Sequence, residues 1–288
     1  MIRDMDTIEQ ADLPALTPTL GPEPEPDYAR RFAGVAQLYG DAGLERLARA
    51  RVVVVGLGGV GSWTAEALAR TAVGSIRLVD LDHISESNTN RQLHAFEGQY
   101  GRAKVEAMAD RLLAINPRCA VETIDDFLDA GNAARCIDGA YILIDAVDSV
   151  AAKLLMVIEA RRRGVALLVC GGTGAKRDAL GLRRSDLAEV RNDALLAKLR
   201  SRLRREQGYP AGSLKGKARR LGVDCLWLDQ PMPVSDALLQ CDADGQALPP
   251  AGLHCGGYGS AAHVTAAVGL AAAGAAIDLI VSDQRQSA

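Results

Sequence analysis

No C-x-x-C pair occurs among the six cysteines of this 288-residue sequence, which lie far apart along the chain. Structural zinc sites are commonly built from such pairs, so the sequence predicts that no zinc is bound. The N-terminus also lacks the pattern of a signal peptide. Scattered cysteines in a chain of this kind are expected to be reduced thiols, which predicts a cytoplasmic protein.

An excess of charge of either sign is also lacking, because 33 Lys and Arg residues stand against 36 Asp and Glu residues. The net charge of -3 excludes a basic field over the whole protein, so a polyanionic partner would have to meet a local patch. Aromatic residues make up only 4% of the chain, whereas the apolar fraction is an ordinary 48% and there are 29 glycines. This composition suits helices packed tightly on a parallel sheet.

Long apolar runs are scarce, and the one at residues 261–282 is long enough to cross a bilayer. It consists mainly of Ala, Val, Gly, Leu and Ile, but it contains His263, Thr265 and Asp278. An Ala- and Gly-rich surface gains little in hydrocarbon, and ionisable groups are costly there. We therefore expect a helix buried in the core or at a dimer interface, with a membrane span as the alternative.

Alternating strand-like and helix-like segments predict an α/β fold with a doubly wound, Rossmann-like, mainly parallel sheet. Residues 1–27 are proline-rich and acidic and are expected to be a disordered leader, and short helices follow between residues 28 and 50. The predicted strands are 52–55, 75–79, 120–124, 142–146 and 166–170, and the predicted helices are 62–72, 104–115, 130–136 and 151–163. Beyond residue 172 we expect a C-terminal extension with further strands, a basic helix and the apolar helix.

A glycine-rich turn, from Gly56 to Gly61 with Gly58 and Gly59 between them, joins the first predicted strand to the next helix. The first glycine would permit the tight turn, Gly58 the approach of a phosphate and Gly61 close contact with the helix. A phosphate would then lie at the helix N-terminus. The motif alone is also compatible with a merely tight turn. Asp80, which ends the next strand, favours a nucleotide because a carboxylate there can hold the ribose hydroxyls.

A polar segment downstream discriminates between NAD and ATP, which the glycine motif leaves open. The run from Ser87 to Gln92 contains Arg91, and Lys104 follows twelve residues after the run ends. Phosphoryl or nucleotidyl transfer needs cations for the charge that develops on phosphate oxygens, whereas a nicotinamide pocket needs no such cluster. The alternative is that these are solvated residues of a loop and a helix start.

Two carboxylates, Asp145 and Asp148, follow the predicted strand 142–146 at the edge where ligands of such sheets bind. A carboxylate there can hold magnesium that bridges phosphates, and Asp148 is the candidate. Helix capping by Asp148 or Ser149 is the alternative.

As a combination, these motifs resemble the adenylating family of ubiquitin-activating enzymes and of the molybdopterin- and thiamine-pathway activators, the ThiF/MoeB/HesA family. The resemblance runs from about residue 31 to residue 172. It implies an ATP-bound homodimer in which Arg31 reaches the partner's site, with Asp148 as the Mg²⁺ ligand and Arg91, Lys104 and Asp148 as catalytic residues. The ATP contacts that it implies are Gly56, Gly58, Gly59, Gly61, Asp80, Asp82, Asn88, Asn90, Arg91, Gln92 and Lys104.

Within this family, the missing C-x-x-C pairs count against the sulfur-carrier activators, which usually carry structural zinc. Asn90 in its loop, the run 145–150, the run 194–200 and the run 221–225 resemble the dehydratases that act on threonylcarbamoyladenosine in tRNA. That resemblance implies one adenylating domain at 28–288, with a nucleotide-binding part at about 28–172 and a substrate and dimer part at about 173–288. It implies that ATP activates the threonyl carboxylate of the modified adenosine next to the anticodon, and that ring closure then expels AMP.

A tRNA partner needs positive charge, and the chain concentrates it between residues 198 and 220. The candidate tRNA contacts are Lys198, Arg200, Arg204, Arg205, Lys215 and Lys217, with a solvated amphipathic helix as the alternative. Cys225 is a candidate nucleophile, although a buried thiol is the commoner role. A monovalent cation near the C-terminal loops and sulfur-relay partners such as a cysteine desulfurase or a sulfur-acceptor protein stay open. The alternative functions are a sulfur-carrier-protein adenylyltransferase and a NAD-binding oxidoreductase.

Overall fold

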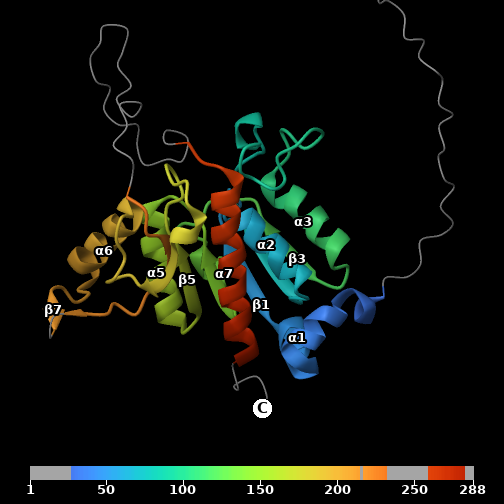
Figure 1. The fold of residues 1–288 in the computed structure, drawn as a ribbon, viewed down its shortest axis with the longest axis horizontal. Helices are drawn as coiled ribbons and strands as arrows, with labels where there is room; N and C mark the ends of the chain where they lie inside the picture. The colour runs from blue at the N-terminus through green and yellow to red at the C-terminus, as the bar shows by residue number, and fades with distance from the viewer. Residues whose placement is uncertain (1–26, 215–216, 232–258, 283–288) are drawn as a thin grey trace, which may run out of the picture.

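The computed structural model describes residues 27–214, 217–231 and 259–282, and its centre is a seven-stranded sheet (Figure 1). The strand order is β3-β2-β1-β4-β5-β9-β6, and every neighbouring pair is parallel except β6 with β9. The strands are β1 Arg51–Val55, β2 Ser75–Val79, β3 Ala120–Ile124, β4 Ile142–Asp145, β5 Ala166–Cys170, β6 Leu182–Asp186 and β9 Asp224–Leu228. The predicted mainly parallel α/β sheet is therefore confirmed, and strands of the C-terminal extension join the same sheet.

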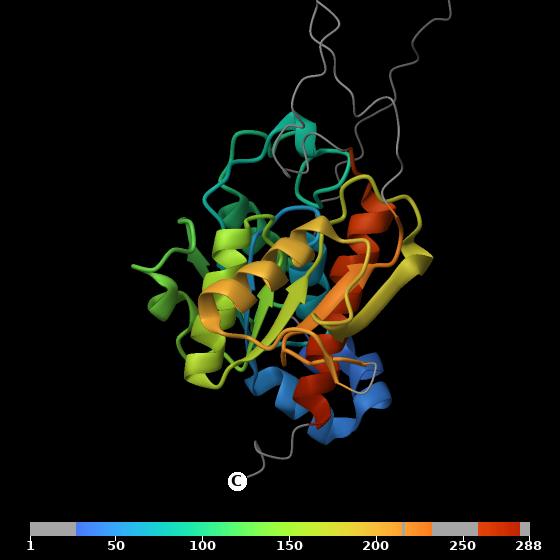
Figure 2. The same ribbon diagram turned by 90° about the vertical axis from the view of Figure 1, so that its left-hand side faces the viewer.

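Helices cover both faces of the sheet, as the buried strands require (Figures 1 and 2). Side chains of β1 alternate between two apolar clusters, with Val52 and Val54 on one side and Val53 and Val55 on the other. The first cluster packs against α1 Tyr28–Arg49, α2 Gly61–Arg70, α3 Lys104–Ile115 and α7 Ala262–Ser282. The other face carries α4 Ala133–Ile137, α5 Val150–Arg163 and α6 Ala194–Gln207. The strands β7 Ser213–Leu214 and β8 Lys217–Ala218 pair as a separate two-stranded antiparallel sheet.

The apolar segment at the C-terminus forms α7, which packs beside α2 and α1 (Figure 1). By length and hydropathy it is the one described helix that could cross a membrane, but 56% of its most apolar window is buried within the protein. Val264, Val268, Ala272 and Ile280 are almost completely buried. Gly269 permits this contact, because a Cβ there would collide with the backbone of Val60. The prediction of a buried helix is thus confirmed.

Two predicted helix boundaries were wrong by a few residues, each for a local reason. The helix predicted at 130–136 begins only at Ala133, because the Asp129 side chain accepts the N–H groups of Gly131 at 2.7 Å and Asn132 at 3.0 Å, which fixes a turn before it. The helix predicted at 62–72 ends at Arg70, because Ala72 adopts a left-handed conformation with φ of 64°.

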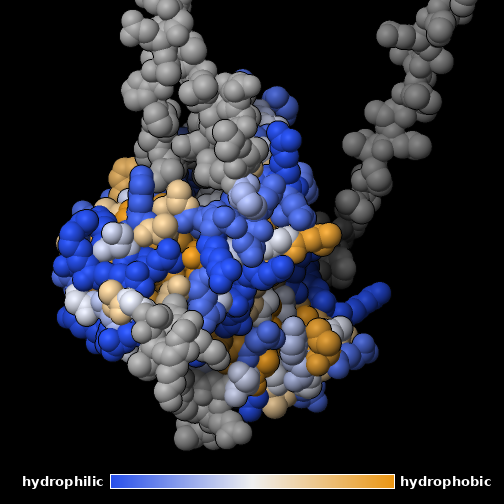
Figure 3. Space-filling view, turned by 60° about the vertical axis from the view of Figure 1, so that its left-hand side comes forward, coloured by the Kyte–Doolittle hydropathy of each residue, from blue (hydrophilic) through white to orange (hydrophobic). Residues whose placement is uncertain are grey.

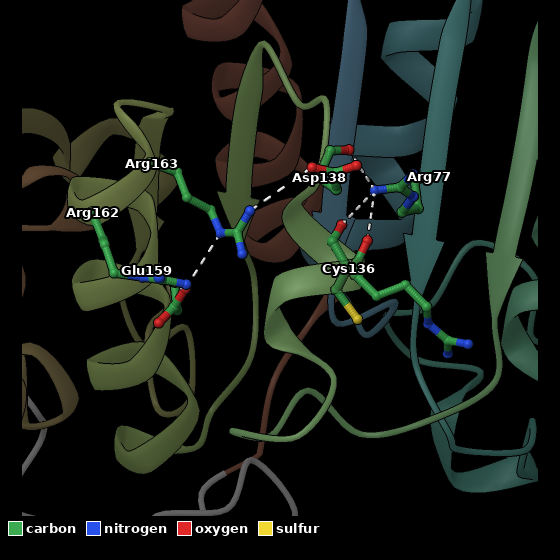
Figure 4. Close-up of polar contacts among 7 residues, drawn as sticks. Arg77, Cys136, Asp138, Glu159, Arg162 and Arg163 are labelled. Atoms are coloured by element: carbon green, nitrogen blue, oxygen red, sulfur yellow. Dashed lines mark hydrogen bonds and ion pairs between the residues drawn. The ribbon is translucent and has the colours of Figure 1, made fainter.

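A buried arginine joins the sheet to the helical layer behind it (Figure 4). Arg77, on β2, donates from Nη1 to the carbonyl oxygens of Arg135 at 3.1 Å, Cys136 at 2.8 Å and Asp138 at 2.9 Å. Its Nε lies 2.8 Å from a carboxylate oxygen of Glu122 on β3. One guanidinium therefore donates hydrogen bonds to carbonyl oxygens at the end of α4, while its charge is paired with Glu122 on the neighbouring strand β3.

Replacement of this guanidinium should destabilise the fold. We expect Arg77→Met to lower the free energy of unfolding by about 2 kcal/mol or more, because three carbonyl groups, of which that of Cys136 is buried, lose their donor while the apolar stem is kept. The matched control is Arg162→Met, because Arg162 is an exposed arginine paired with Glu159 on α5 (Figure 4), and such pairs contribute about 0–1 kcal/mol. Urea unfolding of both variants measures the difference, and equal losses would contradict this role of Arg77.

Candidate functional site

The glycine-rich turn lies at the carboxyl edge of the sheet, between β1 and α2. Gly56 has a φ of +87°, and a Cβ on it would lie 2.9 Å from the carbonyl oxygen of Ala146 in the loop after β4. A Cβ on Gly61 would collide with the carbonyl oxygen of Gly56. By contrast, a Cβ on Gly58 would meet nothing within 4 Å, and α2 begins without a side-chain cap. The turn is therefore tightly packed at Gly56 and Gly61, whereas the space beside Gly58 is unfilled by atoms of the described residues. This space leaves room for a phosphate at the N-terminus of α2.

Asp80 links the end of β2 to this turn. Its carboxylate accepts the N–H of Leu57 at 2.5 Å and the N–H of Asp82 at 2.8 Å. Burial raises the pKa of Asp80, and the nearby Lys104 and these two hydrogen bonds oppose that shift. Asp80 therefore shapes the turn in addition to any contact with a ribose.

Lys104 is buried at the start of α3 instead of being solvated, which excludes the surface alternative for this residue. Its side chain is 5% exposed, and Nζ lies 2.6 Å from Asp82 Oδ2 and 3.8 Å from Asp80 Oδ1. The ammonium group is thus held between two carboxylates beside the glycine-rich turn. The Asp82 side chain is 59% exposed, so a ligand oxygen can reach Lys104 Nζ from solvent and replace Asp82 as its partner.

Arg91 is held above the turn by contacts to its backbone and to its side chain. Its carbonyl oxygen accepts hydrogen bonds from Trp63 Nε1 at 3.1 Å and Thr265 Oγ1 at 3.4 Å. Its Nη1 donates to the Ser87 carbonyl oxygen and to Asn90 Oδ1, both at 2.9 Å. Trp63 and Thr265 were not predicted from the sequence, since no local pattern marks a partner 28 or 174 residues away along the chain.

The other polar residues of this loop have mainly internal contacts. Asn88 ends the short 3-10 helix Glu86–Asn88, where its side chain accepts the N–H of Ser85 at 3.1 Å. Gln92 is buried, and its Oε1 has no partner within the described part of the chain. His94 is also buried, and burial together with Lys104 and Arg111 lowers its pKa to about 4, so it is neutral at physiological pH. No role was predicted for His94 from the sequence.

Asp145 and Asp148 follow β4 but differ sharply in environment. Asp145 is fully buried and lies 2.9 Å from Lys153 Nζ, which also donates to the Cys170 carbonyl oxygen at 2.7 Å. Burial raises the pKa of Asp145, and Lys153 opposes the shift. Asp148 is exposed in the loop, and Ser149 is the residue whose side chain caps α5.

Magnesium would fit the loop after β4 as an ion that is held partly by a protein carboxylate and partly by the phosphates of a bound nucleotide. Among residues 27–214, 217–231 and 259–282 no group of three or more His, Cys, Asp or Glu side chains could enclose a metal. Mg²⁺ in nucleotide sites commonly takes one or two carboxylates, with phosphate oxygens and water as its other ligands. The exposed carboxylate of Asp148 agrees with that arrangement.

Arg31 is not part of its own chain's site. Its Nη1 donates to the carbonyl oxygens of Ile115 at 2.8 Å and Ala114 at 3.3 Å, at the C-terminal end of α3. Lys104 begins the same 12-residue helix, so the two residues lie at ends separated by roughly 17 Å. Any contact of Arg31 with a nucleotide would require a second copy of the chain.

The thiol of Cys225 gains no support as a nucleophile. The residue lies on β9 and is fully buried, and burial raises its pKa well above the usual value for a thiol. A thiol in that environment stays protonated and inert. Cys241 and Cys255 lie outside the described residues.

The candidate tRNA contacts on α6 differ in how far they face solvent. Arg200 donates to the carbonyl oxygens of Leu187 and Val190, both at 2.9 Å, and therefore serves the fold. Arg204 is half-buried and donates to the Pro210 carbonyl oxygen at 3.1 Å. The basic residues exposed in this region are Lys198, Arg205, Arg219 and Arg220. Lys215 lies outside the described residues, and only the backbone of Lys217, in β8, is described.

Two alanine substitutions in the glycine-rich turn should have opposite consequences. We expect Gly61→Ala to lower the free energy of unfolding by about 1–3 kcal/mol, because its Cβ collides with backbone. Gly58→Ala should change it by about 0.5 kcal/mol or less, but should weaken ATP binding because the Cβ fills the open side of the turn. Urea unfolding and ATP titration test the pair, and normal ATP binding by Gly58→Ala would refute the phosphate position.

Comparison with known proteins places this arrangement in a family. The model of the ThiF family matches residues 28–287. The tRNA threonylcarbamoyladenosine dehydratase of Escherichia coli (strain K12) is 43% identical over 249 residues, which are 85% of this chain and 91% of that protein. The protein of the same name from Haemophilus influenzae is 35% identical over 257 residues, 88% of this chain and 95% of that one.

Similarity in three dimensions agrees with the sequence match. The crystal structure of the E. coli tRNA N6-threonylcarbamoyladenosine dehydratase in complex with ATP superimposes with a TM-score of 0.78. The two chains are 38% identical in that alignment, which covers 91% of this chain and 98% of the other. Since the family model spans nearly the whole sequence and the relatives match it over most of their length, this chain belongs to the ThiF family.

Proposed function

We propose that this protein is an ATP-dependent dehydratase of N6-threonylcarbamoyladenosine in tRNA. The observation that carries the proposal is the convergence of Arg91 and Lys104 beside the open glycine-rich turn. The likeness to the two bacterial dehydratases over most of the chain supports the choice of substrate.

In the proposed first step, a carboxylate oxygen of the threonyl group attacks the α-phosphorus of ATP. The bond from this phosphorus to the bridging oxygen breaks, and pyrophosphate leaves. Asp80 would hold the ribose, the backbone at Gly58 would face the phosphates, and Arg91 and Lys104 would reduce the repulsion between the two anions. Mg²⁺ held by Asp148 would add positive charge on the phosphates.

In the second step, the ureido nitrogen of the same nucleoside attacks the activated carbonyl carbon. The carbon–oxygen bond to AMP breaks, AMP leaves, and the nitrogen gives up its proton, so the nucleoside has lost the elements of water. Both reacting groups belong to the substrate. No protein nucleophile is needed, which agrees with the inert environment of Cys225.

The two alternative functions predict different activities. A sulfur-carrier-protein adenylyltransferase would exchange pyrophosphate into ATP only with a small protein as the acid. A NAD-binding oxidoreductase would have no use for Arg91 and Lys104 beside the phosphate position. Exchange assays with modified tRNA, with a carrier protein and with neither separate the three cases.

Loss of either cation should abolish adenylation. We expect Arg91→Ala and Lys104→Ala each to lower the rate of AMP formation with modified tRNA by about 100-fold or more, because charge on the phosphates is no longer neutralised. Arg102→Ala is the matched control, since Arg102 lies two residues before Lys104 and is paired with Asp110 at 2.7 Å. Near-normal rates in both site variants would contradict the assignment.

We also propose that the enzyme acts as a homodimer in which Arg31 of one copy approaches the nucleotide of the other. The position of Arg31 at the far end of α3 from Lys104 supports this, because the residue cannot serve its own site. Exposed Arg31 at the start of α1 is free of carboxylate pairing in the described part of the chain.

For tRNA, we propose contacts with the exposed basic residues Lys198, Arg205, Arg219 and Arg220, which we call the α6 basic surface. Figure 3 turns this side of the molecule forward and shows hydrophilic residues gathered over it. The N-terminal end of α6 adjoins the carboxyl edge of the sheet, where the proposed site lies. Asp193 caps this helix and also accepts the N–H of Gly172 after β5 at 2.9 Å. The helix that carries Lys198 and Arg205 therefore begins near the proposed site and extends away from it.

Charge reversal tests this surface. Lys198→Glu and Arg205→Glu should raise the Kd for tRNA and lower the slope of log Kd against log salt by about 0.7–0.9 for each phosphate that is no longer neutralised. Arg49→Glu on α1 gives the same change in net charge at an exposed arginine elsewhere. An equal effect of all three variants would show that only the net charge matters, and it would contradict the assignment of tRNA contacts to the α6 basic surface.

A further inference from the structure

Asn90 bridges two groups that need opposite ends of its amide. Its Oδ1 accepts a hydrogen bond from Arg91 Nη1 at 2.9 Å, and its Nδ2 donates to the Ser260 carbonyl oxygen at 2.7 Å. A guanidinium can only donate and a carbonyl oxygen can only accept, so the orientation of the amide is fixed by its partners. The side chain thus joins the guanidinium of Arg91 to the residues just before α7.

The bridge leaves the rest of the guanidinium available. Both N–H groups of Arg91 Nη1 are used, one for Asn90 and one for the Ser87 carbonyl oxygen. The other three N–H donors, on Nη2 and Nε, have no hydrogen-bond partner within the described part of the chain. Two parallel donors of this kind suit a bidentate contact with phosphate.

The stem of Arg91 is confined as well. A Cβ on Gly59 would lie 3.1 Å from Arg91 Cγ and 3.0 Å from the side chain of Thr265, so the arginine and α7 both pack directly on the glycine-rich turn. The Arg91 carbonyl oxygen is held by Trp63 Nε1. With backbone and stem fixed, the contacts of Nη1 with Asn90 Oδ1 and with the Ser87 carbonyl oxygen orient the tip of the guanidinium, and Asn90 is the one side chain among these partners.

From this geometry we infer that Asn90 is a positioning residue, which acts on the reaction through Arg91 and ties its guanidinium to the start of α7. The inference rests on the proposed function, in which Arg91 contacts the phosphates of ATP. It replaces the expectation that Asn90 touches ATP itself. Both ends of its amide are already occupied, which leaves one lone pair and one N–H at most for a ligand.

Aspartate should not substitute for asparagine here. Its second oxygen would face the Ser260 carbonyl oxygen, so the contact with the residues just before α7 would become repulsive. Its charge would pair with Arg91 and compete with the phosphates for the guanidinium. Alanine removes both contacts without adding charge. The two variants therefore separate the loss of the bridge from the introduction of a competing carboxylate.

A double-mutant cycle tests the inference with Asn90→Ala, Arg91→Ala and the double variant. In the wild-type background, Asn90→Ala should lower kcat/KM for ATP by about 10- to 100-fold, because the guanidinium is misplaced. In the Arg91→Ala background, it should change kcat/KM by about twofold or less, since residues that act through one another are not additive. The same loss in both backgrounds would overturn the inference and make Asn90 an independent contact.

Thr89→Val is the control for general loosening of the loop. Thr89 precedes Asn90, and its Oγ1 bonds to the Glu86 carbonyl oxygen at 2.7 Å and to Tyr100 Oη at 2.8 Å, without contact to Arg91. We expect nearly normal kcat/KM for this variant and a loss with Asn90→Asp at least as large as with Asn90→Ala. Normal activity of Asn90→Asp, or a loss with Thr89→Val equal to that with Asn90→Ala, would refute the role of the bridge.

Failure of the proposed function would look different. The same cycle measured as the Kd for ATP without tRNA does not depend on which acid is activated. Coupling between positions 90 and 91 in ATP binding, together with no turnover of modified tRNA by the wild-type protein, would reject the substrate and retain the inference. Additive effects on ATP binding in a wild-type protein that does convert tRNA would reject the inference alone.

Discussion

The geometry of the site depends on the carboxylate of Asp80. It accepts backbone N–H groups from Leu57, in the glycine-rich turn, and from Asp82, after β2, and it lies 3.8 Å from the ammonium group of Lys104. Three segments that are separate in sequence are thereby held around one charge. Burial alone would favour the neutral acid, so the hydrogen bonds and Lys104 supply the compensation that a buried carboxylate needs.

The same requirement explains why the cations of the site have oxygen partners within the protein. A buried, unpaired ammonium group is strongly unfavourable, and Asp82 provides Lys104 with a carboxylate at 2.6 Å. Arg91 is held by a carbonyl oxygen and an amide oxygen, which leave its net charge intact. A phosphate would compete with Asp82 for Lys104, whereas it could approach the remaining N–H groups of Arg91 without displacing the groups that hold it.

Much of the fold could be predicted from the sequence, because a strand covered on both faces needs a continuous apolar run. Val52 to Val55 and Ile142 to Ile144 are such runs, and the start of α3 at Lys104 was also predicted correctly. The insertion of β9 between β5 and β6 depends on pairing between distant segments, which no local pattern encodes. The fixation of Arg91 by Trp63 and Thr265 escaped prediction for the same reason, whereas the motif itself indicated the glycine-rich turn between β1 and α2.

The basic run on α6 shows that local charge in a sequence overstates the charge that a fold leaves for a partner. Arg200 is half-buried and donates to two carbonyl oxygens of the preceding loop. Arg202 and Arg205 pair with the carboxylate of Glu206 and lower its pKa to about 2, although 67% of the Arg205 side chain stays exposed. Since the whole chain carries a net charge of -3, attraction of a polyanion rests on the few cations that remain exposed. Each such cation contributes to affinity through released counterions, so a surface with few phosphate contacts would bind tRNA with a shallow salt dependence. Phosphate contacts carry no sequence information, so the selection of tRNA would be left to contacts at the carboxyl edge of the sheet, where the proposed site lies.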